Sequence, residues 1–87
     1  MEIIKKKGNV EEFNISKVRQ SIMNVANEIG QSLTDADLKV IQKNTEDVLK
    51  SLKRETTSSY EVFAIVLNVL SDLGFDNIAK SYFEGSL

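Results

Sequence analysis

The segment from Ser59 to Leu73 constrains the fold most, because the helix that it predicts is apolar on most of its circumference. Its apolar residues are Val62, Phe63, Ala64, Ile65, Val66, Leu67, Val69, Leu70 and Leu73. A run rich in Val and Ile also suits a strand, but its length and the lack of an internal turn signal favour a helix. Such a helix has to lie at the centre of a bundle or be partly buried by a partner.

Three further helices are predicted around this segment. One over residues 16–29 carries a single apolar stripe, and Gly30 is placed to end it. Another begins at Thr34, an N-cap candidate with Asp37 three residues later, and a short one covers residues 76–83. The stripe of the first of these helices is Val18, Ile22, Val25, Ala26 and Ile29. The second is expected to carry Leu38, Ile41, Val48, Leu49 and Leu52 inward, and the short one carries Ile78, Ala79, Tyr82 and Phe83.

The connection Thr56-Thr57-Ser58-Ser59 interrupts the helical pattern with residues that tolerate strands and cap helices. Ser58 with Glu61 fits the S-x-x-E capping box. Ser59 is the competing cap, and the pattern leaves the choice open.

The N-terminal segment, residues 1–14, predicts a β-hairpin. Gly8 and Asn9 lie between two short strand-like runs, and Gly at the first central position suits a type II′ turn. The cross-strand pairs of that turn are Lys7–Val10, Lys6–Glu11, Lys5–Glu12 and Ile4–Phe13. An isolated hairpin is only marginally stable in water, so one of its faces has to rest on the helices.

These elements predict an α+β fold, a four-helix bundle with an N-terminal β-hairpin packed across it. The chain has 87 residues, enough for one modest core, and no proline, repeat or low-complexity segment marks a boundary. We therefore expect a single domain over residues 1–87, with the hairpin in residues 1–14 and the helical bundle in residues 16–87.

Composition excludes several classes of function. The chain has no histidine and no cysteine, which rules out Ser-His and Cys-His catalysis, disulfides and cysteine zinc sites. No P-loop, dinucleotide-binding or nucleophile-elbow motif occurs, and acidic neighbours such as Glu46 and Asp47 are typical of solvated charges. We expect a domain without catalytic residues. No window approaches the ~20 apolar residues of a membrane span and no signal peptide is recognisable, so we expect it in the cytoplasm.

The charge of the chain is unevenly distributed. A net charge of −2 and a pI of about 5.1 disfavour nucleic acid as a partner. Lys5, Lys6 and Lys7 are nevertheless adjacent, and Lys17 follows on the first helix. This local cluster suits one small polyphosphate better than a long one. Alternatively, lysines on an outer strand only prevent edge-to-edge aggregation.

Glu11 and Asn14 also have two interpretations. Glu11 could pair with Lys6 across the hairpin, and Asn14 could cap the turn into the first helix. Alternatively, a carboxylate and an amide close together are the groups that read an adenine edge, which offers an amine donor and ring-nitrogen acceptors. Spacing alone does not decide between these interpretations.

Residues 3–18, IIKKKGNVEEFNISKV, resemble the opening signature of the ATP-cone family. In that signature a strand and a Lys-Arg-Asp-Gly-type turn lead into a Glu-x-Phe-Asp/Asn strand and a Lys-Ile helix start. The closing residues 76–82, DNIAKSY, are similar to the family's Ala-Lys-x-Tyr ending. The order and spacing agree over essentially the whole chain.

This resemblance implies a regulatory domain that binds ATP or dATP, with Mg²⁺ accompanying the triphosphate because several negative oxygens must be neutralised. ATP-cones sit at the N-terminus of many ribonucleotide reductases, where they sense ATP against dATP and switch quaternary structure. They also form the effector domain of the reductase-gene repressor, whose cysteine zinc ribbon is lacking in this sequence. The family fold, a four-helix bundle capped by a three-stranded sheet, implies a third strand from the region of residues 54–57.

The family's ligand-binding positions map onto ten residues of this chain. Those on the hairpin and the first helix are Ile3 for the base pocket, Lys5 and Lys6 for the phosphates, Glu11 and Asn14 near the adenine, and Lys17 and Val18 at the helix start. Those on the third helix are Ser59, Val62 and Phe63. The N–H groups that open the third helix suit an anion.

Three features depart from the family pattern. Lys6 replaces an arginine and gives up a bidentate contact for a point charge, and Phe63 replaces a polar residue beside the sugar. The chain ends Phe83-Glu84-Gly85-Ser86-Leu87, without the family's basic ending. These departures support a rival interpretation, a degenerate cone that acts as a protein–protein interaction module without binding a nucleotide.

The third helix also predicts self-association. Its apolar circumference exceeds what a small bundle and one sheet easily cover, and leftover apolar surface marks an interaction site. We expect a symmetric homo-oligomer coupled to nucleotide binding, or docking onto a ribonucleotide reductase. The alternative is a monomer in which the other helices bury this face.

Overall fold

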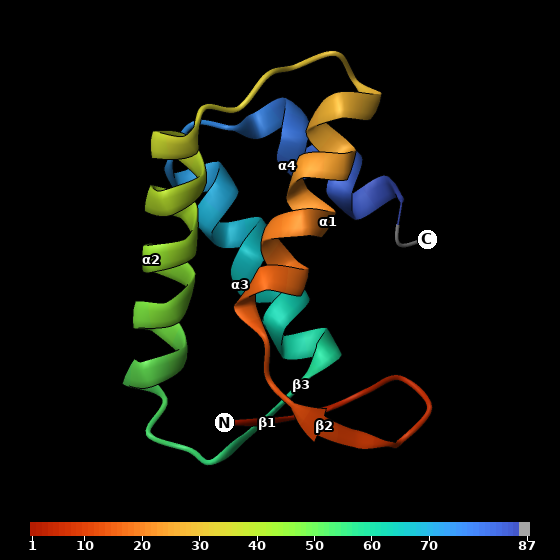
Figure 1. The fold of residues 1–87 in the computed structure, drawn as a ribbon, viewed down its shortest axis with the longest axis vertical. Helices are drawn as coiled ribbons and strands as arrows, with labels where there is room; N and C mark the ends of the chain where they lie inside the picture. Colours follow the sequence, from red (N-terminus) through yellow and green to blue (C-terminus); the bar gives the residue numbers. More distant parts are fainter. Residues whose placement is uncertain (86–87) are drawn as a thin grey trace.

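Figure 1 shows four helices packed into a bundle with a small sheet at one end, in a computed structural model that describes residues 1–85. In chain order the elements are β1 (Glu2–Ile4), β2 (Val10–Glu12), α1 (Ile15–Glu28), α2 (Asp35–Ser51), β3 (Thr56–Ser58), α3 (Ser59–Asp72) and α4 (Asp76–Glu84). The predicted α+β fold is confirmed. Within the described range, no helix combines the length and apolar character needed to cross a membrane.

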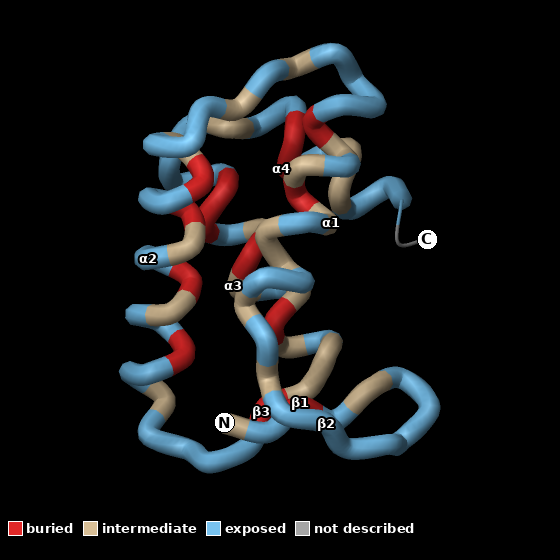
Figure 2. The backbone as a smooth tube through the Cα atoms, viewed as in Figure 1, coloured by how far each residue is buried: buried red, intermediate tan, exposed pale blue. Residues whose placement is uncertain are grey.

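The helix α3 lies at the centre of the bundle, where it packs against α2 and α4. Val66 and Leu70 are completely buried, whereas Ala64 is exposed. In Figure 2 the buried residues of α2 lie on the side of that helix that faces α3. The buried apolar residues of the core are Ile3, Ile22, Ala26, Leu38, Ile41, Leu49, Val62, Val66, Val69, Leu70, Ile78 and Ala79. Neighbouring elements of the same chain therefore cover most of the apolar circumference of α3.

The helices α2 and α3 begin at predicted capping residues. Thr34 Oγ1 accepts a hydrogen bond from the Asp37 N–H at 3.0 Å, and Asp37 Oδ2 accepts one from the Thr34 N–H at 3.1 Å, which completes a capping box. Ser58 Oγ accepts a hydrogen bond from the Glu61 N–H at 3.1 Å. Ser58, not Ser59, is therefore the N-cap of α3.

Two positions of the predicted apolar stripes are exposed. Ile29 follows the last turn of α1, and Val48, which was predicted to face inward, points away from the inner face of α2. Thr45 takes the inward position on α2 instead and is completely buried. Its hydroxyl donates to the Ile41 carbonyl oxygen at 2.8 Å, so burial leaves this group satisfied.

The predicted hairpin forms, but its predicted turn is wrong. The Lys5 N–H donates to the Asn9 carbonyl oxygen and the Gly8 N–H donates to the Lys5 carbonyl oxygen, both at 2.8 Å. The loop therefore contains three residues, Lys6, Lys7 and Gly8. Gly8 has a φ of 89°, so it closes the loop in the left-handed region instead of opening a two-residue turn.

The longer loop changes the register of the hairpin. Ile4 pairs with Val10, and not with Phe13 as predicted, while Ile3 pairs with Glu11. The observed pairing differs from the predicted one by an odd number of residues. Side chains alternate between the two faces of a strand, so this shift changes which side chains of the two strands share a face. Ile3 and the half-buried Phe13 now face the helices together, and Ile4 and Val10 face outward. The burial of both apolar residues explains why this register is preferred.

The third strand, β3, runs parallel to β1 and lies on its other side from β2. It starts at Thr56, slightly later than the expected 54–57 region, and pairs Ile3 with the buried Thr57. The sheet order β2-β1-β3 makes β1 the central strand. The N-terminal strand β1 is thus held by β3, which follows the second helix and is distant from β1 in the sequence.

Glu61 fastens β3 to the first turn of α3. Its carboxylate accepts a hydrogen bond from Thr57 Oγ1 at 2.6 Å and another from the Arg54 guanidinium, with which it forms an ion pair. These bonds, first that of Arg54 and then that of Thr57, hold the pKa of Glu61 below its ordinary value. The contacts fix the point at which the chain leaves the sheet and enters α3.

We predict that Gly8→Ala lowers the free energy of unfolding by about 1 kcal/mol, because most residues with a Cβ are strained in the left-handed region, Asn less than the others. A Cβ at this position would meet no atom within 4 Å, so the cost is one of backbone conformation and not of packing. Urea unfolding measures the change. Gly8→Asn is the control and should lose less, and equal stability of the wild type and Gly8→Ala would contradict the three-residue loop.

We predict that Glu61→Gln is less stable than the wild type at neutral pH and that the difference disappears in acid. The pKa of Glu61 is lowered in the folded state, so its carboxylate stabilises the fold above the unfolded pKa of about 4.3. That contribution is lost as the pH falls through the folded pKa. Thermal unfolding from neutral to acidic pH measures it, with Glu28→Gln at the end of α1 as the control. A difference that stays constant with pH would exclude this role.

Candidate ligand-binding site

A cavity of about 390 Å³ lies where the sheet meets the helices. Its walls come from β1 and the hairpin loop, from the first two turns of α1 and of α3, and from the last turn of α4. Small-molecule sites have volumes of roughly 300–1,000 Å³, so this cavity is large enough for one such ligand.

Eight of the ten residues expected at a ligand site line this one cavity. They are Ile3, Lys5, Lys6, Lys17, Val18, Ser59, Val62 and Phe63. They come from residues 3–18 and 59–63, and the parallel pairing of β1 with β3 brings these two segments together. Glu11 and Asn14 are not part of the lining.

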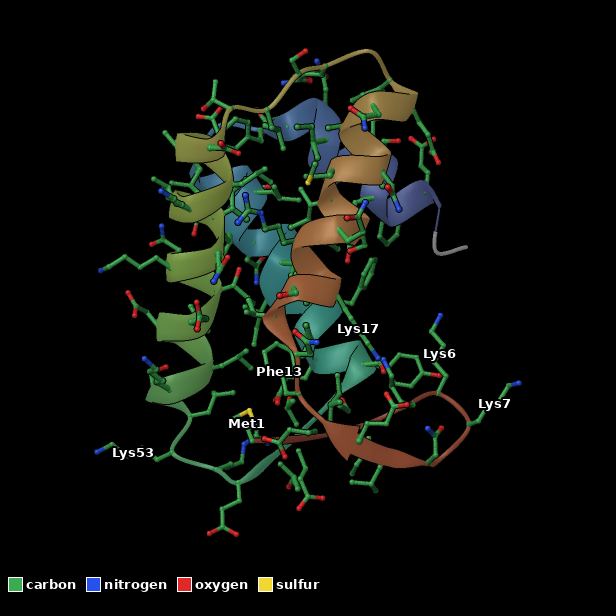
Figure 3. The ribbon with its side chains drawn as sticks, viewed as in Figure 1. Met1, Lys6, Lys7, Phe13, Lys17 and Lys53 are labelled. Carbon is green, nitrogen blue, oxygen red and sulfur yellow. The ribbon has the colours of Figure 1, made fainter. Side chains whose placement is uncertain are left out.

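The lysine side of the cavity carries more positive than negative charge. Glu11 Oε2 lies 3.8 Å from Nζ of both Lys5 and Lys17, so one carboxylate serves two ammonium groups. The ion pair between Glu11 and Lys6 that the predicted register implied does not form, because the register is different. In Figure 3 Lys6 and Lys17 extend into the region between the hairpin loop and the helices. This side suits an anionic group.

The opposite side of the cavity is aromatic. The ring of Phe63 is stacked on those of Tyr82 and Phe83, with centroid distances of 5.4 Å and 6.4 Å. The Tyr82 hydroxyl lies 3.0 Å from Ser21 Oγ, and the Ser21 hydroxyl donates to the Val18 carbonyl oxygen at 2.8 Å. This hydroxyl pair joins α4 to α1 beside the aromatic wall.

Asn14 and Ser59 lie at helix starts beside the cavity. Asn14 Oδ1 accepts a hydrogen bond from the Ser16 N–H at 3.0 Å, and Asn14 is the N-cap of α1. This contact agrees with the capping interpretation of Asn14. Ser59 Oγ donates to the Ile4 carbonyl oxygen at 3.4 Å, which ties the first residue of α3 to β1.

Four lining residues were missed by the sequence reasoning. They are Ser21, Tyr60, Tyr82 and Phe83. The sequence analysis places Tyr82 and Phe83 on the last helix without linking them to the site. The one available signal was Tyr60, a large ring among polar residues, and it is 66% exposed at the cavity. The position of α4 relative to the hairpin depends on tertiary packing that no local pattern reports.

The cavity combines ammonium groups, hydroxyls and stacked rings. Among residues 1–85, no group of three or more His, Cys, Asp or Glu side chains could hold a metal ion. The arrangement is suited to binding a molecule that has an anionic part and a flat apolar part. The lysines would hold the anionic part and the aromatic and aliphatic walls the flat part.

The comparisons with known proteins agree with this geometry. Residues 1–84 match the model of the ATP cone domain, and a search of curated proteins found no match to the chain. The family match covers the hairpin, all three strands and the four helices described above. ATP-cone domains are nucleotide-binding regulatory domains that bind adenine nucleotides as effectors. Because the match spans nearly the whole sequence, this chain belongs to the ATP-cone family.

Proposed function

We propose that the cavity binds ATP or dATP reversibly and that the domain regulates ribonucleotide reductase, either as part of the enzyme or through control of its genes. The observation that carries this proposal is one cavity with lysines on one side and stacked aromatic rings on the other. A nucleotide has the matching parts, a phosphate chain and a planar base. The domain performs no chemistry itself, and we place it in the cytoplasm as a single domain of residues 1–87.

The phosphates would lie against Lys5, Lys6 and Lys17, and among residues 1–85 Glu11 is the one carboxylate paired with these lysines. The apolar side chains of Ile3, Val18 and Val62 would contact the base, and Phe63 would stack beside the sugar. Glu11 and Asn14 would act from the edge of the site, Glu11 by holding Lys5 and Lys17 and Asn14 by capping α1.

Mg²⁺ would accompany the triphosphate. Two or three lysines do not neutralise a triphosphate fully, and Mg²⁺ is usually bound by phosphate oxygens and water with few protein ligands. The described residues offer no cluster of acidic side chains for the ion. The nucleotide would therefore carry its own Mg²⁺ into the site.

We predict that calorimetric titration detects ATP and dATP binding but little GTP binding, and that Lys6→Ala weakens ATP binding about tenfold. An ammonium that contacts a phosphate contributes roughly 1.5–3 kcal/mol, and about 1.4 kcal/mol corresponds to a factor of ten. Lys6 is the cleanest choice because it lines the cavity and forms no ion pair with any residue in the described range. Lys39→Ala on α2 removes the same charge away from the cavity and is the matched control.

The rival function is that of an interaction module that no longer binds a nucleotide. Tyr60 and Phe83 support it, because both line the cavity and both are large exposed rings. If neither ATP nor dATP gives heat at millimolar concentration, the rival function replaces the first. A loss of ATP affinity in Lys39→Ala as large as in Lys6→Ala would instead mean that the effect is one of overall charge.

We also propose that nucleotide binding and self-association are coupled. Most of α3 is covered within the chain, so the interface would use the exposed rings beside the cavity, Tyr60 and Phe83, with Ala64 on the outer side of α3. A ligand shifts such an equilibrium only by its differential affinity for the two states. Docking onto a reductase subunit would use the same surface.

We predict that saturating ATP or dATP changes the mass of the protein measured by light scattering at micromolar concentration. A tenfold preference of the ligand for one oligomeric form is worth about 1.4 kcal/mol per site, and two sites double that value. Tyr60→Ser should reduce this change in mass. Val40→Ser removes an exposed apolar side chain from the outer face of α2 and is the control, in which the change in mass should persist. A monomer of unchanged mass under every condition would rule out both the interface and the coupling.

A further inference from the structure

A second hollow adjoins the cavity at the hairpin loop. It has a volume of about 370 Å³ and is lined by Lys5, Lys6, Lys7, Asn9 and Ser59. Lys5, Lys6 and Ser59 also line the cavity, so the two spaces share these three residues. None of the described residues that line the second hollow is aromatic. A ligand that leaves the cavity past Lys5 and Lys6 therefore enters a space made of polar groups.

The tip of the loop has charges and donors without partners. Lys6 and Lys7 form no ion pair with any other residue of the described range, whereas Lys5 is paired with Glu11. The backbone N–H groups of Lys6 and Lys7 likewise donate to no group within residues 1–85. Loop backbone donors of this kind are often satisfied by anions or water. In Figure 3 the Lys6 side chain extends from the loop toward the helical end of the molecule, and the Lys7 side chain projects outward from the tip of the loop.

The protection of a strand edge does not explain these lysines. β1 is the central strand of the sheet, and Lys5 to Lys7 follow its end. The outer strand β2 contains Val10, Glu11 and Glu12 and no lysine. Lysine side chains discourage edge-to-edge association only where they lie on the exposed edge itself. A different role is needed for Lys7.

We infer that Lys7 binds the terminal part of the phosphate chain outside the cavity, which makes the domain selective for nucleoside triphosphates over monophosphates. This inference rests on the proposed function. The base occupies the aromatic and aliphatic side of the cavity, the first phosphate lies near Lys5 and Lys17, and the chain continues past Lys6 into the second hollow. A monophosphate is too short to reach Lys7.

Calorimetric titration of Lys7→Ala with AMP, ADP, ATP and inorganic tripolyphosphate tests the inference. An exposed ion pair contributes up to about 1 kcal/mol, equal to a factor of about five. We expect ATP affinity to fall about two- to fivefold in Lys7→Ala and further in Lys7→Glu, while AMP affinity is unchanged. Lys7→Arg keeps the charge and should retain the affinity of the wild type. Lys39→Ala is the control for net charge.

The outcomes separate this inference from the proposed function. An unchanged ATP affinity in Lys7→Ala, or an equal loss for AMP and ATP, overturns the role of Lys7 and leaves the nucleotide site standing. If no nucleotide binds but tripolyphosphate binds in a Lys7-dependent way, the loop is a polyphosphate site and the proposed function fails. If neither nucleotides nor tripolyphosphate bind, both are overturned.

Discussion

The burial of α3 is the constraint on which the rest of the structure depends. A helix that is apolar on most sides needs neighbours on most sides, and α2, α4 and the sheet supply them. The start of α3 is the point where these neighbours meet, and Glu61 holds it there through Thr57 and Arg54. The cavity lies beside this junction because three helix ends and a short sheet leave space between them.

The lysine side and the aromatic side of the cavity are supported by different elements. Glu11 on β2 orients two of the lysines, whereas the stack of Phe63 with Tyr82 depends on the packing of α4 against α3. The hydroxyl pair of Ser21 and Tyr82 connects these two supports through α1. The lysine side thus depends on Glu11, which does not line the cavity, and the aromatic side depends on the packing between α3 and α4.

The helices could be predicted closely because capping residues and the 3.6-residue period are local signals, as at Thr34 and Ser58. The hairpin register could not, because Gly8 suits both a two-residue and a three-residue loop, and only the burial of Ile3 with Phe13 selects between them. Most of the expected site residues come together in one cavity, but Tyr82 and Phe83 join them through tertiary packing. The ending at Ser86 and Leu87 lies outside the described residues.

The sheet order has a consequence for how the cavity forms. β1, at the beginning of the chain, pairs with β3 across the whole of the first two helices, and α4 completes the wall from the other end. Closing such a long loop is costly in chain entropy, so we expect the cavity to be among the last parts to be assembled. We likewise expect fraying of β1 or α4 to open the cavity before the α2–α3 core unfolds. A nucleotide bound as proposed would join the two ends of the described chain, and the melting temperature of the domain would rise with nucleotide concentration.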